Sequence, residues 1–177
     1  MRDPEPDCWL HEAVEVRRSD VAGRGLFATA DLPAGVTVSQ LGGRLVDGAT
    51  VRGPSAGREE NADRMLERVM VAEGRYLIVA PGDNRFGNHG CDPNLGWVDE
   101  YALATMTDVS AGDELLVDYA MSIVEPDWFL RCHCPSYRCR QMVEGTDWRI
   151  PQLQQRYDGW WTPYVQGLVD ASGGRGS

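Results

Sequence analysis

The stretch Arg85-Phe-Gly-Asn-His-Gly-Cys-Asp-Pro-Asn94 gathers amide, imidazole, thiol and turn-forming groups in ten consecutive positions. So many polar groups close together predict a functional site. A structural interpretation stays open, in which Gly and Pro stiffen a turn and the Asn side chains satisfy nearby backbone groups. Taken alone, this stretch does not separate the two interpretations.

A second stretch, Gly112-Asp-Glu-Leu-Leu-Val-Asp-Tyr119, predicts a turn followed by a strand. Its signal is weak by itself, because antiparallel proteins contain many such strings and a Tyr at the end of a strand usually packs. The occurrence of both stretches in one sequence is a more specific signal of function than either stretch alone.

The cysteines are unevenly distributed. Three of the five form a Cys-x-Cys-x4-Cys cluster, and the full set is Cys8, Cys91, Cys132, Cys134 and Cys139. In a reducing compartment such clustering favours a bound metal over disulfides. Thiols without metal, buried or reactive, are the alternative.

Composition limits the class of protein. A chain of 177 residues with 42% apolar and 25% charged residues is typical of one soluble globular domain with a small appendage. No apolar run approaches the roughly 20 residues of a membrane helix, and the opening MRDPEPDCWL does not resemble a secretory signal. We therefore expect a cytoplasmic protein with no membrane association.

The net charge is −10, from 27 acidic and 17 basic residues, and all of the basic residues are Arg because the chain contains no Lys. An acidic surface repels nucleic-acid phosphates and attracts basic peptides. We expect basic protein partners and no direct binding of nucleic acid. The oligomeric state is left open.

The hydrophobic pattern predicts a mainly β body. Short runs bounded by Gly, Pro, Asp or Asn indicate strands at Val14–Arg17, Leu26–Ala28, Val36–Gln40, Arg44–Val46, Tyr76–Ala80, Leu95–Val98, Ala102–Thr107 and Glu114–Asp118.

Helical periodicity is rarer. Met65, Leu66, Val69 and Met70 predict one helix over Glu59–Ala72, and a short helical turn is expected at Pro126–Leu130. The aromatic residues of the C-terminal segment are expected to pack on the domain without a catalytic role; they are Trp148, Tyr157, Trp160, Trp161 and Tyr164.

Together the two polar stretches resemble the paired signatures of SET-domain protein-lysine methyltransferases, Asn-His-x-Cys-x-Pro-Asn and Gly-x-Glu-Leu-x-x-Asp-Tyr. Gly23-Arg-Gly-Leu-Phe27 is similar to the family's Gly-x-Gly cofactor motif, and the Cys cluster is similar to its post-SET segment. The resemblance covers residues 14–140, and four motifs in the family's order make coincidence improbable.

The resemblance implies a SET-domain (β-clip) fold: small, mostly antiparallel sheets around a pseudo-knot, one inserted helix and a C-terminal post-SET appendage. The expected divisions are a SET domain at 14–120, a zinc segment at 121–145 and an aromatic extension at 146–171.

The resemblance also implies S-adenosylmethionine as cofactor and the side-chain amine of a protein lysine as methyl acceptor. Tyr119 matches the catalytic tyrosine and also touches the cofactor. The other expected cofactor contacts are Gly23, Arg24, Gly25, Leu26, Arg85, Phe86, Asn88 and His89. A structural Zn²⁺ is expected on Cys91, Cys132, Cys134 and Cys139, because four thiolates close the coordination sphere.

These residue types suit the reaction. A lysine with a reference pKa of about 10.4 is protonated at neutral pH, so presenting the free amine costs roughly 4–5 kcal/mol. An apolar channel and the cofactor's sulfonium both lower the lysine pKa, which removes the need for a general base. Tyr119 then has to orient the nitrogen toward the methyl group.

Two positions depart from the family pattern. Leu41-Gly42-Gly43 stands where the family usually has Tyr-x-Gly, so a second tyrosine hydroxyl is missing. Val117 stands where many members carry Phe or Tyr, and its smaller side chain favours di- or trimethylation. A catalytically weak or inactive module that binds the cofactor or a basic peptide is therefore an alternative, and a zinc-held interaction domain is a third.

Overall fold

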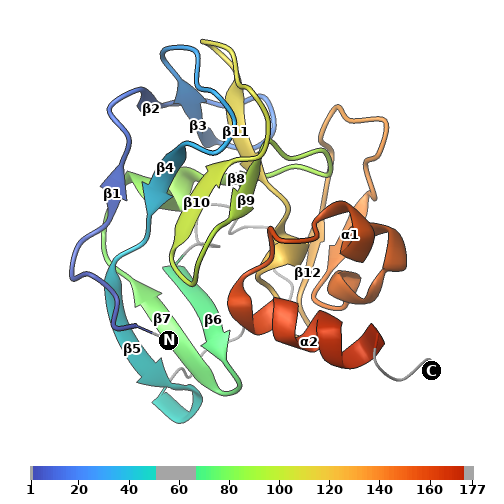
Figure 1. The fold of residues 1–177 in the computed structure, drawn as a ribbon. Coiled ribbons are helices and arrows are strands. Elements are labelled where there is room, and N and C mark those ends of the chain that lie inside the picture. The colour runs from blue at the N-terminus through green and yellow to red at the C-terminus, as the bar shows by residue number, and fades with distance from the viewer. Residues whose placement is uncertain (1, 51–66, 174–177) are drawn as a thin grey trace.

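The computed structural model describes residues 2–50 and 67–173. The largest sheet has eight strands, mostly antiparallel, in the order β1-β4-β10-β9-β11-β3-β2, with β8 paired to β11 beside this path (Figure 1). Their bounds are β1 Trp9–Leu10, β2 Val14–Arg18, β3 Arg24–Ala28, β4 Thr37–Gln40, β8 Asn88–His89, β9 Leu95–Trp97, β10 Ala102–Thr105 and β11 Glu114–Val117. The expected mainly β fold of small sheets is confirmed.

Strand β11 differs from its neighbours because it runs parallel to both β8 and β9 while pairing antiparallel to β3. Leu116 lies opposite Asn88, and Val117 lies opposite both His89 and Leu95. The parallel pairing carries the end of β11 alongside the polar stretch predicted from the sequence. The two stretches therefore meet in space.

A second sheet has three strands in the order β5-β7-β6, with bounds Gly43–Asp47, Arg75–Val79 and Arg68–Ala72. The helix predicted over Glu59–Ala72 is wrong for its last five residues, which form β6; residues 59–66 lie outside the described part. Val69 and Val71 alternate inward, as in a strand, and a tight turn with φ +65° at Gly74 returns the chain to β7.

The third sheet pairs β12, Phe129–Arg131, with β13, Met142–Glu144. The helical turn predicted at Pro126–Leu130 is wrong, because Phe129 and Leu130 belong to β12. The apolar residues Leu130 and Val143 are partners across the pair, and Val143 is fully buried. Cross-strand pairing thus decides the structure of this segment.

Short helices complete the fold: the 3-10 helices η1 Gly48–Thr50, η3 Asp83–Phe86, η4 Tyr119–Met121 and η5 Asp147–Arg149, and the α-helices α1 Pro151–Arg156 and α2 Pro163–Gly173. In Figure 1 the two α-helices lie together beside β12. Tyr157, Trp161 and Val165 belong to the same buried cluster as Leu26, Trp97 and Val117. The C-terminal segment therefore packs into the main core.

Among residues 2–50 and 67–173, no helix combines the length and apolar character needed to cross a bilayer.

Candidate active site and metal centre

The side chain of Asn88 connects the two strands that carry the expected cofactor residues. Its amide nitrogen lies 3.1 Å from the carbonyl oxygen of Ala22, 2.9 Å from that of Arg24 and 2.8 Å from Oε1 of Glu114. These bonds hold the Gly23–Gly25 turn against β8 and β11. The amide NH₂ group of Asn88 thus donates its hydrogen bonds to other groups of the protein.

Position 25 requires glycine because the neighbouring side chains leave no space for a Cβ atom. A Cβ atom there would lie 2.1 Å from Oε1 of Glu114 and 3.1 Å from the Asn88 amide nitrogen. The Glu114 carboxylate is itself held, because its other oxygen accepts a 2.9 Å hydrogen bond from the hydroxyl of Ser19. Only glycine lets β3 approach β8 and β11 this closely.

Arg24, Phe86 and Arg85 also come together. The guanidinium carbon of Arg24 lies 3.8 Å from the ring centroid of Phe86, and that of Arg85 lies 4.8 Å away. Phe86 is buried, whereas both arginines are exposed. Two cations on one ring next to the Gly-x-Gly turn form a surface suited to an anionic group such as a carboxylate.

Tyr119 lies where β11 ends, and its side chain is only 4% exposed. The hydroxyl donates a 2.8 Å hydrogen bond to the carbonyl of Gly87, and the backbone N–H donates to Nδ1 of His89 at 3.2 Å. Its ring contacts those of His89 and Trp128, with centroid distances of 5.2 and 6.3 Å. Tyr119 is therefore fixed in position by polar and aromatic contacts.

The Tyr119 hydroxyl stays protonated at ordinary pH. Burial raises the pKa of Tyr119 above its usual range, and the nearby Glu114 carboxylate raises it further. A neutral phenol beside the paired strands β8 and β11 can orient a reactant by hydrogen bonding. It cannot act as a general base.

Four cysteines form a compact cluster next to Tyr119. The Sγ atoms of Cys91, Cys132, Cys134 and Cys139 all lie within 4.8 Å of one another, and those of Cys91 and Cys132 are 3.9 Å apart. Tetrahedral Zn²⁺ with Zn–S bonds of about 2.3 Å separates its sulfurs by roughly 3.8 Å. The donor set and its spacing fit a closed structural zinc site, and all four cysteines are free of disulfides.

Protein groups also support the cysteine sulfurs. Nε2 of His89 lies 3.3 Å from Sγ of Cys91, and the backbone N–H of Arg140 donates to the same sulfur at 3.4 Å. Cys91 is therefore suited to be a thiolate ligand.

The contacts of His89 fix its tautomer. Its Nδ1 accepts from Tyr119, so the ring hydrogen sits on Nε2 and points at Cys91. With both ring nitrogens used inside the protein, a contact from His89 to a cofactor has to come from its backbone.

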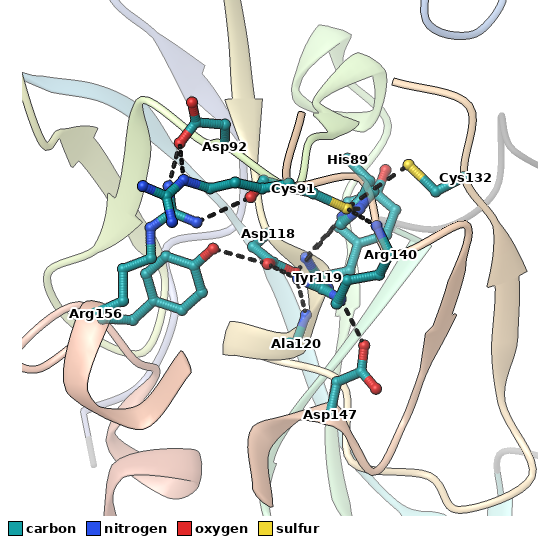
Figure 2. A network of polar contacts seen from close by, with 12 residues as sticks. His89, Cys91, Asp92, Asp118, Tyr119, Ala120, Cys132, Arg140, Asp147 and Arg156 are labelled. Atoms are coloured by element: carbon teal, nitrogen blue, oxygen red, sulfur yellow. Dashed lines mark hydrogen bonds and ion pairs between the residues drawn. The ribbon is translucent and has the colours of Figure 1, made fainter. Parts of the chain in front are cut away.

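Asp118 is the largest site feature that the sequence did not reveal. Its carboxylate is fully buried and accepts a bidentate pair of hydrogen bonds from Arg140, at 2.6 and 2.7 Å. Figure 2 shows this pair beside Tyr119 and the Cys91–Cys132 contact. Tyr157 adds a third donor at 2.9 Å, and the Ala120 N–H adds a fourth at 3.0 Å. Asp118 and Glu114 both lie in the Gly-x-Glu-Leu-x-x-Asp-Tyr motif, which was the available signal.

The two departures from the family pattern are both buried. Leu41 is 0% exposed and Val117 is 1% exposed. Leu41 offers no hydroxyl, and Val117 ends β11 two residues before Tyr119, opposite His89 and Leu95.

The SET domain family matches residues 23–120, more than half of the chain. Histone-lysine N-methyltransferase 2D of Homo sapiens is 24% identical over 138 residues, which are 73% of this chain and 2% of that protein. Histone-lysine N-methyltransferase trithorax of Drosophila virilis is 30% identical over 143 residues, 73% of this chain and 4% of that protein. The chain spans less than a twentieth of the length of these two relatives.

Solved structures share the fold. The crystal structure of KRYPTONITE in complex with mCHG DNA and SAH aligns with a TM-score of 0.56 at 24% identity, covering 73% of this chain and 28% of that chain. A complex of KRYPTONITE with mCHH DNA, H3(1-15) peptide and SAH gives a TM-score of 0.55 at 21% identity, covering 75% and 30%. The family match contains the Gly-x-Gly turn, the paired strands β8 and β11, Cys91 and Tyr119, so this chain belongs to the SET domain family.

Proposed function

We propose that this chain transfers methyl groups from S-adenosylmethionine to the side-chain amine of lysine in a protein substrate. The observation that carries the proposal is the position of the Tyr119 hydroxyl, held on the Gly87 carbonyl where β8 and β11 run side by side. The names of the relatives, which are histone-lysine N-methyltransferases, and the SAH bound in the KRYPTONITE structures support the choice of reaction.

In this proposal Tyr119 orients the amine. Its one hydrogen is donated to Gly87, so its oxygen keeps a lone pair free to accept a hydrogen bond from an incoming lysine nitrogen. Because the phenol is neutral and buried, it aims the nitrogen without taking up its proton. S-adenosylmethionine, when bound, would supply the methyl group from its sulfonium.

Deprotonation of the lysine is assisted by its surroundings. The rings of Trp128 and His89 flank Tyr119, and Val117, the last residue of β11, comes two positions before it in the sequence. A lysine that reaches Tyr119 enters this poorly hydrated region, where desolvation disfavours the ammonium form. The proposed zinc site is closed, so it has a structural role and takes no part in the transfer.

We propose a basic protein as substrate. The net charge of −10 favours cationic partners and disfavours direct contact with nucleic acid. The H3(1-15) peptide in one KRYPTONITE complex agrees with a histone-like target. An intracellular location is also part of the proposal, because a tetrathiolate site needs reduced cysteines.

The product is proposed to be di- or trimethyl-lysine. Val117 is smaller than Phe or Tyr and leaves room beside Tyr119 for methyl groups already added. Exclusive formation of monomethyl-lysine under excess enzyme would contradict this proposal.

Leu41 favours a second candidate, a SET-fold module that binds the methyl donor without efficient transfer. The side chain is fully buried and supplies no hydroxyl to a lysine channel. Binding of SAH without methyl transfer to any basic protein would support this module over the enzyme.

The test is incubation of the purified chain with radiolabelled S-adenosylmethionine and a panel of basic proteins, including histone H3, with an acidic protein as comparison. Because the chain has no Lys, any labelled lysine belongs to the added protein. The proposal expects label on lysine of a basic protein. Absence of label from every protein in the panel would contradict it.

A further inference from the structure

The C-terminal segment reaches the active site through polar contacts as well as packing. Tyr157, just after α1, donates its hydroxyl to Oδ2 of Asp118 at 2.9 Å, and both residues are fully buried. Asp118 immediately precedes Tyr119. One carboxylate thus joins the C-terminal segment to the short helix η4, which begins with the proposed catalytic phenol.

The same carboxylate holds the zinc segment. Arg140 follows Cys139 and grips Asp118 with both terminal nitrogens, while its backbone N–H donates to Sγ of Cys91. Nε of Arg140 forms an ion pair with Asp147 at 2.8 Å, which Figure 2 shows below the Asp118 contact. Arg140 is therefore bound between the metal site, the Tyr119 segment and the C-terminal segment.

A second contact comes from the same helix. Arg156, the last residue of α1, donates to the carbonyl of Cys91 at 3.0 Å and pairs with the Asp92 carboxylate. These contacts fix the turn between β8 and β9 that contains the metal ligand Cys91. Arg156 at the end of α1 and Tyr157 just after it thus contact both polar stretches that meet at Tyr119.

Packing alone does not require this arrangement. A buried ion pair contributes little net stability compared with apolar side chains of the same volume, but its directional bonds define one orientation. Asp118 has four protein donors, so its position is fixed from three separate segments.

We infer that Tyr157 and Arg140 are positioning residues for methyl transfer, acting through Asp118 to hold the zinc segment and Tyr119 in register. By this inference the end of α1, at Arg156 and Tyr157, is a working part of the active site. The inference rests on the proposed function.

The test compares Tyr157→Phe with Tyr164→Phe, both in the purified zinc-loaded chain. Tyr157→Phe removes one hydroxyl and keeps the ring, whereas Tyr164, in α2, has no contact with Asp118 among the hydrogen bonds of the described residues. We expect Tyr157→Phe to lower kcat roughly tenfold, as loss of a supporting hydrogen bond behind a functional site does. SAH affinity, substrate KM and zinc content should stay within about threefold of wild type, because Tyr157 makes no direct hydrogen bond to the described residues of the proposed cofactor, substrate or zinc sites. Tyr164→Phe should keep wild-type kcat.

A double variant tests the shared route. Arg140→Lys keeps the positive charge but loses the bidentate pair of hydrogen bonds to Asp118, and this change alone should lower kcat. Because both residues act through Asp118, the loss in Tyr157→Phe/Arg140→Lys should fall well short of the product of the two single losses.

Three results would overturn the inference. They are an unchanged kcat in Tyr157→Phe, a parallel fall of kcat, SAH affinity and zinc content, and multiplicative losses in the double variant. A wild-type chain that binds no SAH and transfers no methyl group would overturn the proposed function itself, and the inference with it.

Discussion

The backbone N–H of Tyr119 donates to Nδ1 of His89, 30 residues earlier in the sequence, at 3.2 Å. The other ring nitrogen of His89 faces Sγ of Cys91 at 3.3 Å. One imidazole thus connects the proposed metal ligand Cys91 to Tyr119, the residue proposed for the reacting centre. The geometry of Tyr119 is consequently tied to the state of the cysteine cluster.

Tyr119→Phe should lower the single-turnover rate of methyl transfer by roughly 100-fold, by analogy with loss of one preorganised polar group in other active sites. SAH affinity should change little, since the ring remains. The Gly87 carbonyl loses its partner, so unfolding by urea should show a destabilisation of about 1 kcal/mol. A rate equal to that of wild type would remove Tyr119 from the mechanism.

Removal of the metal should unfold the zinc segment and lower activity. The purified chain is expected to contain about one zinc, because four thiolates complete one tetrahedral site. Cys134→Ser should lose the metal and lower Tm, since metal binding contributes directly to folding. Cys8→Ser is the matched control: Cys8 is a half-buried free thiol that contacts Gly42 and Ala80 and lies outside the cluster. Equal zinc content in wild type and Cys134→Ser would contradict the assignment.

Gly25→Ala should damage the cofactor site. Its Cβ would displace the Glu114 carboxylate, with a cost of about 1–3 kcal/mol that is typical of overpacking. Calorimetric titration should show weaker SAH binding than in wild type. Gly167→Ala is the control, because Gly167 lies in α2 with no heavy atom within 4 Å of the added Cβ. It should leave SAH binding unchanged and stabilise the helix by about 0.5–1 kcal/mol. Wild-type SAH affinity in Gly25→Ala would show that this turn is not part of the site.

Protonation of Asp118 should make the free energy of unfolding fall at acidic pH. Burial raises the pKa of Asp118. The hydrogen bonds from Arg140 and the positive charge of its guanidinium lower the pKa by more than burial raises it, so the pKa of Asp118 lies below its usual range. A lowered folded-state pKa stabilises the protein above the unfolded value of about 3.9, and this contribution is lost as pH falls further.

Comparison with Asp118→Asn isolates this effect from protonation of the cysteines. Removing one partner of a buried ion pair should cost about 3–5 kcal/mol near neutral pH. The difference between the two proteins in urea unfolding should shrink as the pH is lowered through about 4 toward 3. A difference that stays constant over this range would contradict the lowered pKa.

Short strands were the part of the fold that sequence could predict. Runs such as Leu95–Trp97 and Ala102–Thr105 are apolar and bounded by turn residues, so local pattern and final structure agree. The helix prediction is wrong over Arg68–Ala72 because Val69 and Met70 also fit a helical period. Its conformation is decided by pairing with β7, which a local pattern does not contain.

The candidate site was predictable to the extent that its residues occur in motifs. The Cys91 cluster, Tyr119 and the Gly23–Gly25 turn were all identified from spacing or resemblance. The link from Asp118 to Arg140 and Tyr157 was not, because these residues lie 22 and 39 positions away with no periodic signal between them. Contacts of this kind become visible only when the chain is folded.

The proposed function requires a methyl-donor site where β8 and β11 meet, beside the Tyr119 phenol. Calorimetric titration of SAH into the zinc-loaded wild-type chain measures this site without any methyl acceptor. We expect saturable binding of about one SAH per chain, as for a single site. Absence of any binding heat or saturation, in a folded chain that retains its zinc, would contradict it.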